Sequence, residues 1–151
     1  GELIYRGPNV MKSYYGKLSE TQKVLKNGWL YSGDIAIKDE DGFFFIVDRK
    51  KEMIIRGGMN IYPREVEEVM MKHPDISMVA VVGIADEKLG EEVKAFVVKK
   101  NGSDISEEEI KNWTKEKLAS YKYPRSIEFL NQLPINASGK ILKKLLKTEK
   151  I

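Results

Sequence analysis

Two apolar segments in the middle of the chain constrain its fold most strongly. Residues 76–82 and residues 93–98 are almost entirely apolar, and many of them are β-branched. Runs of this length are short for helices, and their composition is typical of strands that are covered on both faces. The sequence therefore predicts a sheet with other parts of the chain packed on both sides of these strands.

Helical patterns alternate with these strands. A helix is predicted to begin at Pro63, because proline fits the first helical position. Its inward face repeats at helical spacing and contains Val66, Val69, Met70 and His73. Ser106 and Glu109 have the spacing of a capping box and predict the start of a second helix. Three further elements, two strands and one amphipathic helix, are predicted at residues 52–56, 127–130 and 141–147.

The first part of the chain contains strand and turn signals instead. Three strands are predicted there, with the hairpin signal Asp41-Gly42 before the last of them: residues 2–6, 35–37 and 43–47. The sequence therefore predicts an α+β chain in two parts. Residues 1–48 are expected to be the strand-rich end of a larger N-terminal domain. Residues 49–151 are expected to form a compact C-terminal domain of common size, with a small sheet of about three strands flanked by helices.

The composition is that of an ordinary globular chain. Of the 151 residues, 42% are hydrophobic and 32% are charged, which is enough apolar material for a domain with a core. The net charge of +3 is a property of the chain's end, where five lysines stand against one glutamate from Lys140 onward. Because proteins that bind nucleic acid usually carry a broad basic face, no nucleic acid partner is expected.

No segment is predicted to cross a membrane or to anchor stably in one. The longest apolar stretch is far shorter than the roughly 20 residues that a bilayer requires, and the terminal amphipathic segment is also short. The chain has no cysteine, which excludes disulfides and fits a cytoplasmic location. It opens in a strand signal at Gly1, without an initiator methionine or a signal peptide pattern, and we expect a piece of a longer protein.

Two charged side chains lie near predicted strand ends in the first part. Asp34 follows Gly33, and its carboxylate has two acceptor oxygens that could bind the vicinal hydroxyls of a ribose. Arg49 stands at the boundary between the two parts, where its guanidinium could bind ribose oxygens or phosphate. Each also has a simpler explanation, since Ser32, Gly33 and Asp34 are common turn residues and Arg49 belongs to a run of charged residues.

Two further segments combine glycine with possible ligand contacts. Gly57 and Gly58 allow positive φ and close backbone approach, although a hairpin turn alone explains them. Lys140 follows Gly139 in a predicted loop, and its ammonium could offset charge that develops at a phosphate during a reaction. The alternative for Lys140 is a solvated lysine at the start of a basic helix, the commonest environment of lysine.

The order of these segments resembles one protein family. The chain is similar to the closing third of an adenylate-forming acyl-CoA synthetase, most like a medium- or long-chain fatty-acid–CoA ligase, along essentially its whole length. The segments that carry the resemblance are Gly28-Trp29-Leu30, Tyr31-Ser32-Gly33-Asp34, Asp48-Arg49-Lys50-Lys51, Gly57-Gly58, Asn60-Ile61-Tyr62-Pro63-Arg64-Glu65-Val66-Glu67 and residues 133–142 with Ser138-Gly139-Lys140. The chain departs from the usual pattern at Asn60, where some relatives have arginine, and at Ile135-Asn136, where Lys-Thr is usual.

The resemblance implies a role for each candidate residue. Asp34 and Arg49 would bind the nucleotide throughout the reaction. Lys140 would be the catalytic residue and would also contact ATP or AMP. Gly58 would line the tunnel for the pantetheine arm of CoA. Lys51 would be the hinge, near residues 49–51, about which a mobile C-terminal domain turns.

The reaction implied by the resemblance has two steps. A carboxylic acid, expected to be a fatty acid, reacts with ATP and Mg²⁺ to give an acyl-adenylate and pyrophosphate, and the thiol of CoA then displaces AMP. ATP, Mg²⁺ and CoA are therefore the expected cofactors of the intact ligase, and no metal ligand is expected in this segment.

The resemblance also places this segment within the larger enzyme. The family's phosphate-binding loop and acyl pocket lie upstream of it, so the isolated chain is expected to be inactive and to dock on its own N-terminal domain. Two alternatives stay open. One is an aryl-acid CoA ligase of the same family, and the other is a non-catalytic α+β module that binds a partner.

Overall fold

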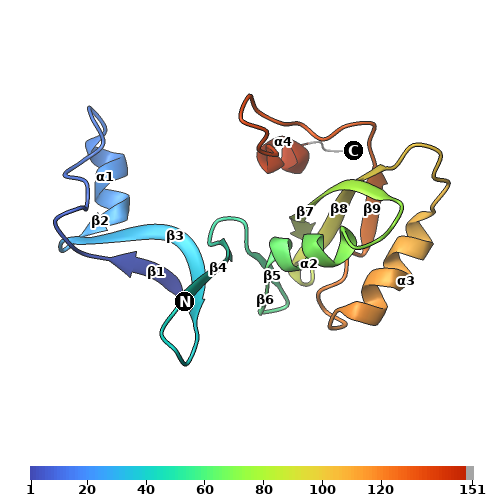
Figure 1. Ribbon diagram of the computed structural model, residues 1–151, viewed down its shortest axis with the longest axis horizontal. Coiled ribbons are helices and arrows are strands. Elements are labelled where there is room, and N and C mark those ends of the chain that lie inside the picture. Colours follow the sequence, from blue (N-terminus) through green and yellow to red (C-terminus); the bar gives the residue numbers. More distant parts are fainter. Residues whose placement is uncertain (149–151) are drawn as a thin grey trace. The chain divides into compact units, whose positions relative to one another are not determined.

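The computed structural model describes residues 1–148 of the chain. The chain divides into two compact units, Gly1–Lys51 and Glu52–Ile151 (Figure 1). Both units combine strands and helices, and most of the strand pairs are antiparallel. The predicted α+β fold class is therefore confirmed.

The first unit is a four-stranded antiparallel sheet with one short helix. Its elements are β1 (Glu2–Tyr5), α1 (Leu18–Val24), β2 (Leu25–Lys26), β3 (Trp29–Lys38) and β4 (Phe44–Arg49). The long strand β3 organises the sheet, since it pairs with β1, β2 and β4. It begins at Trp29 rather than at residue 35 as predicted, because its first half pairs with β1 and β2.

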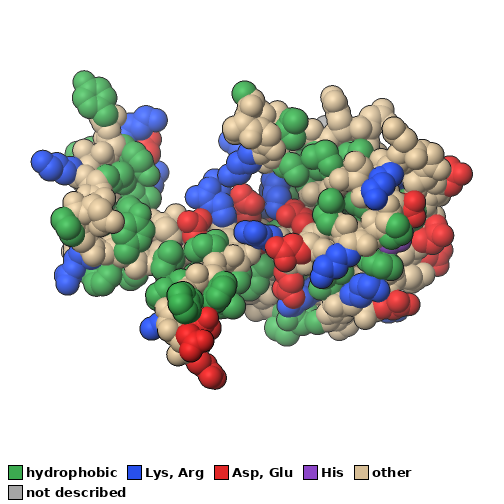
Figure 2. All heavy atoms as spheres, in the orientation of Figure 1, with side chains coloured by type: hydrophobic (Ala, Val, Ile, Leu, Met, Phe, Trp, Pro, Cys, Tyr) green, Lys and Arg blue, Asp and Glu red, His purple; other side chains and the backbone are tan. Residues whose placement is uncertain are grey.

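The first unit buries few apolar side chains. Of its described hydrophobic residues, only Ile35 and Ala36 are buried. Several large side chains are exposed instead, among them Phe43, Phe44 and Phe45, and Figure 2 shows hydrophobic side chains on the visible surface of this unit. This sheet therefore has little core of its own. Burial of apolar surface, the dominant favourable term in folding, contributes little to its stability.

The second unit is built around a five-stranded sheet. Its elements are β5 (Ile54–Arg56), β6 (Met59–Ile61), α2 (Pro63–Met70), β7 (Ile76–Asp86), β8 (Gly90–Lys99), α3 (Glu107–Lys117), β9 (Ser126–Phe129) and α4 (Lys143–Thr148). The strand order is β6-β5-β8-β7, and β9 pairs with β8 in parallel. The sheet is larger than predicted, because the hairpin of β5 and β6 joins β8 at Gly90 and β9 adds to the same strand.

The long hairpin of β7 and β8 confirms that its strands are covered on both faces. Side chains alternate across a strand, so Val79 and Val81 lie in one buried cluster and Ala80 and Val82 lie in another. Helices α2 and α3 complete the first cluster with Val66, Met70 and Ile110. The C-terminal segment completes the second with Leu133 and Leu146. Because the side chains alternate, the two faces of one sheet belong to two separate cores.

Helices α2 and α3 begin where the sequence predicts. Pro63 is the first residue of α2. At the start of α3, the Ser106 hydroxyl accepts a hydrogen bond from the Glu109 N–H at 3.2 Å, and the Glu109 carboxylate accepts one from the Ser106 N–H at 2.8 Å. This reciprocal pair is the predicted capping box, and it satisfies two backbone donors at the helix end.

Helix α4 begins later than predicted. It starts at Lys143 rather than at residue 141, because Ile141 pairs with Ile135 in an isolated antiparallel bridge. Within residues 1–148, the helices are too short and too polar to span a lipid bilayer.

Candidate functional site

Asp34 and Arg49 form a cross-strand ion pair in the first unit. They stand opposite each other on β3 and β4, and the Arg49 Nε donates to Asp34 Oδ1 at 3.2 Å. The Arg49 and Asp34 side chains are 41% and 34% exposed. Both groups can therefore reach a ligand, and the arginine has further N–H donors beyond the one in this pair.

The backbone around Gly33 holds this pair in place. Gly33 has a φ of 74°, which favours glycine. The Ser32 hydroxyl donates to the carbonyl of Leu3 at 2.7 Å and accepts from the Asp34 N–H at 3.0 Å. The Lys50 N–H donates to the Gly33 carbonyl at 2.8 Å. Asp34 therefore projects from a backbone that is bonded to both neighbouring strands, and the segment is more than an isolated turn.

Lys51 is an exposed turn residue that follows β4. The division between the two compact units falls directly after it, between Lys51 and Glu52. Its assignment as the hinge concerns movement and stays a prediction.

Gly58 lies in the turn of the hairpin formed by β5 and β6. Gly57 and Gly58 have φ values of 55° and 80°. A Cβ atom at Gly57 would meet the Leu89 side chain at 3.3 Å, whereas the corresponding space at Gly58 is open. The packing of the domain therefore restricts Gly57, and Gly58 presents a bare backbone that a ligand could approach closely.

A partly buried ion pair fixes the base of this hairpin. The Arg56 Nε lies 2.6 Å from Glu92 Oε1, and each side chain is only 16% exposed. The hydrogen bond to Glu92 raises the pKa of Arg56. Burial raises the pKa of Glu92, but hydrogen bonds from Arg56 and from the Val93 N–H outweigh it, so this pKa lies below its ordinary value. Both groups are charged at neutral pH, and the pair holds β5 against β8.

Lys140 lies in an exposed loop that precedes α4. Its backbone is bonded to Asn136 on both sides: its N–H donates to Asn136 Oδ1 at 2.8 Å, and its carbonyl accepts from the Asn136 N–H at 2.9 Å. Its ammonium forms no ion pair with any residue between 1 and 148. A free cation on an ordered backbone suits contact with a carboxylate or a phosphate.

A charge network anchors the helix that follows this loop. The Lys143 Nζ lies 2.7 Å from Glu67 Oε1 and 3.5 Å from Glu52 Oε2. The same Glu67 oxygen accepts a hydrogen bond from the Val81 N–H at 2.7 Å. Helix α4 is therefore held to α2, to β7 and to the first residue of the second unit. No local sequence pattern predicts this network, because its members are far apart along the chain.

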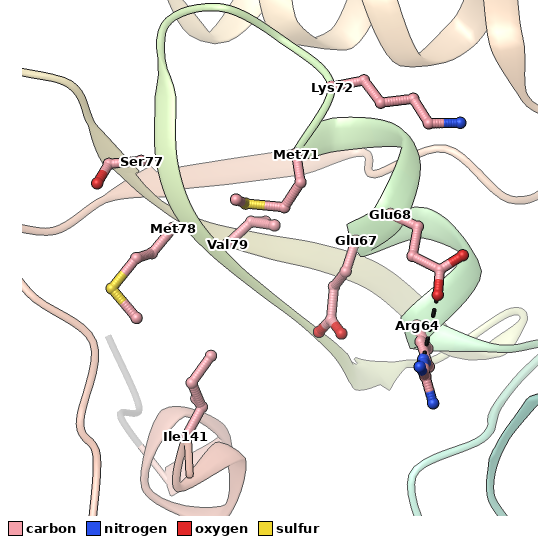
Figure 3. Close-up of a pocket in the computed structure, with 9 residues that line it drawn as sticks. All are labelled: Arg64, Glu67, Glu68, Met71, Lys72, Ser77, Met78, Val79 and Ile141. Atoms are coloured by element: carbon pink, nitrogen blue, oxygen red, sulfur yellow. Dashed lines mark hydrogen bonds and ion pairs between the residues drawn. The ribbon is translucent and has the colours of Figure 1, made fainter. Parts of the chain in front are cut away.

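A groove lies beside this network, between α2, β7 and the segment before α4 (Figure 3). It has a volume of about 590 Å³. Its apolar lining includes Met71, Met78 and Ile141, and the Arg64–Glu68 ion pair, with 3.1 Å between Nε and Oε1, also borders it. No predicted site residue lines the groove.

The predicted site residues thus occupy four places. Asp34 and Arg49 are paired in the first unit, and Lys51 ends that unit. Gly58 and Lys140 lie on separate loops of the second unit, one between β5 and β6 and the other before α4. Within the described chain, no group of three or more His, Cys, Asp or Glu residues is arranged to hold a metal ion.

The second unit contains a segment that matches a known family. Residues 65–140, about half of the chain, match the family described as AMP-binding enzyme C-terminal domain. The chain belongs to this family. The resemblance inferred from the motifs is therefore confirmed, and the matched range of this AMP-binding C-terminal domain includes most of α2, the central hairpin and Lys140.

Curated proteins similar to this AMP-binding C-terminal domain extend the match into the first unit. The chain is 50% identical over 149 residues to the long-chain-fatty-acid–CoA ligase of Bacillus subtilis, and the match covers 99% of this chain and 27% of that protein. It is 50% identical over 143 residues to a feruloyl-CoA synthase of an Amycolatopsis species, with 95% of this chain and 29% of that protein covered. The chain thus spans less than a third of these relatives.

A solved structure has a similar fold. The o-succinylbenzoate CoA synthetase of Bacillus subtilis, solved in complex with an acyl-adenylate intermediate, matches with a TM-score of 0.89 and 41% identity. The match covers 99% of this chain and 31% of that structure. The AMP-binding C-terminal domain and the strands before it are therefore found together in a longer protein.

Proposed function

We propose that this chain is the closing part of an AMP-forming ligase, which activates a carboxylic acid with ATP and transfers the acyl group to CoA. The observation that carries the proposal is the match of 95–99% of the chain to proteins named as CoA ligases and CoA synthases. The partly exposed Asp34–Arg49 pair and the free Lys140 ammonium support it, because both have the chemistry that a nucleotide requires.

In this proposal the first unit holds the nucleotide. The Asp34 carboxylate accepts hydrogen bonds from ribose hydroxyls, and Arg49 both orients that carboxylate and donates to the nucleotide. ATP would react as its Mg²⁺ complex.

Lys140 and Gly58 serve different steps in this proposal. During adenylation the Lys140 ammonium contacts the substrate carboxylate and the α-phosphate, where it stabilises charge that builds as oxygen attacks phosphorus. During thioester formation the bare backbone at Gly58 lines the path of the pantetheine arm. Because these residues lie on separate loops, a turn of the second unit about Lys51 would present each in its own step.

The expected substrate is a fatty acid. The similarity to the long-chain-fatty-acid–CoA ligase of Bacillus subtilis supports this choice. An aryl acid is the second candidate, and the equal identity to a feruloyl-CoA synthase favours it specifically. We further propose that the second unit docks on the N-terminal domain of its own protein and that the intact ligase is cytoplasmic.

The test uses Lys140→Ala in the intact ligase. The rate of acyl-adenylate formation should fall by about a hundredfold or more, because a preorganised charge at the reaction centre is lost. Thiolysis of a supplied acyl-adenylate by CoA should stay near the wild-type rate. Both half-reactions are followed separately, by pyrophosphate release and by acyl-CoA formation.

The matched control is Lys147→Ala, which removes an exposed lysine from the following helix. Its half-reactions should be those of the wild type. Equal loss of both half-reactions in Lys140→Ala would contradict the catalytic role. If the intact protein bound neither ATP nor an acyl-adenylate analogue in a titration, the non-catalytic module would be favoured instead.

A further inference from the structure

We propose that Asn136 is a positioning residue, which fixes the backbone of the Lys140 loop for adenylation. The inference rests on the proposed function of Lys140 and assigns a role to a residue that differs from the usual pattern of the motif. The loop has no apolar packing to shape it, since residues 135–140 are all exposed. Its conformation must therefore come from hydrogen bonds and from its backbone.

One oxygen of the Asn136 side chain accepts several hydrogen bonds from the loop. Its Oδ1 accepts from the Ser138 N–H at 3.1 Å, from the Ser138 hydroxyl at 2.8 Å and from the Lys140 N–H at 2.8 Å. Two of these donors are backbone N–H groups, which can only donate, so the amide oxygen must face the loop. Loss of this one oxygen would remove all three bonds.

Backbone hydrogen bonds form a tight turn around this oxygen. The Gly139 N–H donates to the Asn136 carbonyl at 2.9 Å, which defines a four-residue turn with asparagine first and glycine last. Gly139 has a φ of 79°, a conformation that favours glycine. The Asn136 N–H also donates to the Lys140 carbonyl at 2.9 Å, and Ile135 pairs with Ile141. The chain therefore reverses direction at a defined point, with Lys140 at its exit.

These hydrogen bonds order the backbone of Lys140 and leave its side chain free. Both backbone polar groups of Lys140 are bonded to Asn136, while its ammonium has no ion pair within residues 1–148. Asn136 thus sets the position and direction from which the Lys140 side chain starts, and the side chain itself stays available. Ordering the backbone in advance lowers the entropic cost of placing the ammonium at the reaction centre.

The simpler explanation is that Asn136 only forms an exposed turn. Asparagine is common at the first position of such turns, and a turn can exist without any effect on catalysis. The two explanations differ in one respect. A positioning residue affects adenylation, the step that uses Lys140, and spares the step that does not.

The experiment compares three variants of the intact ligase. Asn136→Leu keeps the side chain's size and removes its acceptor. Asn136→Asp keeps an acceptor oxygen in the same place. Asn131→Leu is the matched control, because Asn131 is exposed on the same segment and its side chain forms none of these loop bonds.

Two kinds of measurement follow. The first is amide hydrogen exchange of residues 135–142, which should become roughly fivefold faster in Asn136→Leu, the effect of losing hydrogen bonds worth about 1 kcal/mol. The second is the pair of half-reactions. Acyl-adenylate formation should fall by about ten- to a hundredfold in Asn136→Leu, as expected for a misplaced catalytic group, while thiolysis of a supplied acyl-adenylate should be unchanged. Asn136→Asp should retain the slow exchange and most of the adenylation rate.

Three outcomes would overturn the inference: wild-type adenylation in Asn136→Leu, equal loss of both half-reactions in that variant, or the same losses in Asn131→Leu. Lys140→Ala, measured in parallel, separates this inference from the proposed function. If Lys140→Ala leaves adenylation intact, the role of Lys140 is wrong. If Lys140→Ala abolishes adenylation and Asn136→Leu does not impair it, only the role of Asn136 is wrong.

Discussion

At the scale of single residues, Arg56 and Glu92 show how an ion pair can hold a candidate ligand-binding turn. The pair joins β5 to β8 directly beside the hairpin that carries Gly58. Its side chains are largely buried, so water competes little for their hydrogen bonds. Removing one partner of such a pair costs more than breaking an exposed ion pair, because the other charge is left unmatched.

We predict that Glu92→Gln lowers the free energy of unfolding of the chain by about 1–2 kcal/mol at pH 7, since a charge-assisted bond becomes a neutral one. The folded pKa of Glu92 lies below the ordinary value of 4.5. The stabilisation by the carboxylate is therefore fully present above pH 4.5 and is lost as the pH falls through the lower, folded pKa. Urea unfolding at several pH values between 7 and 3 measures the difference between the variant and the wild type.

The control for this prediction is Glu116→Gln, which changes an exposed carboxylate on α3. Its unfolding free energy should match the wild type at every pH. A constant difference between Glu92→Gln and the wild type across the acid range would contradict the role of the Glu92 charge.

At the scale of elements, local patterns account for much of the second unit. Pro63 begins α2, and Ser106 with Glu109 begins α3, as the sequence predicts. The two apolar segments become the long strands β7 and β8, and their alternating side chains enter separate cores. These predictions succeed because a helix cap depends on residues three positions apart, and a strand's faces depend on residues two positions apart.

We predict that Ser106→Ala lowers the unfolding free energy of the chain by about 1 kcal/mol, because the N-cap hydroxyl that accepts from the Glu109 N–H is lost. The measurement is urea unfolding followed by far-ultraviolet circular dichroism. Ser120→Ala, at an exposed position just after α3, is the control and should change stability little. A loss no larger than that of the control would show that the cap contributes nothing.

At the scale of the whole molecule, the chain contains two compact units that meet in sequence between Lys51 and Glu52. The first has little buried apolar surface, whereas the second has a core on each side of its sheet. In the proposed ligase these units carry different parts of the chemistry. The backbone at Lys51 is then the place where a change of dihedral angles would separate the two steps.

We predict that Lys51→Pro in the intact ligase uncouples adenylation from thioester formation. Proline fixes φ near −65° and restricts the residue before it, so one orientation should be favoured and one half-reaction should fall by about tenfold or more relative to the other. Lys51→Ala is the matched control, because it removes the charge and keeps a free backbone. Single-turnover measurements of each half-reaction provide the test, and wild-type rates in Lys51→Pro would reject the hinge.

The candidate site could be predicted from the sequence only in part. The motifs pointed to Asp34, Arg49, Gly58 and Lys140, and their assigned roles stay predictions. The contacts around them were not predictable. Asp34 meets Arg49 because β3 and β4 pair in one particular register. A shift of one residue would place these side chains on opposite faces of the sheet.

The sequence by itself determined the family, the α+β class and the main helix and strand positions of the second unit, because each depends on residues that are near neighbours in the chain. The tertiary structure decided which distant residues meet. The five-stranded sheet and the bridge from Lys143 to Glu67 and Glu52 depend on how strands and helices pack. No local pattern encodes such contacts, since strand register and helix packing are set by burial of apolar faces across the whole unit.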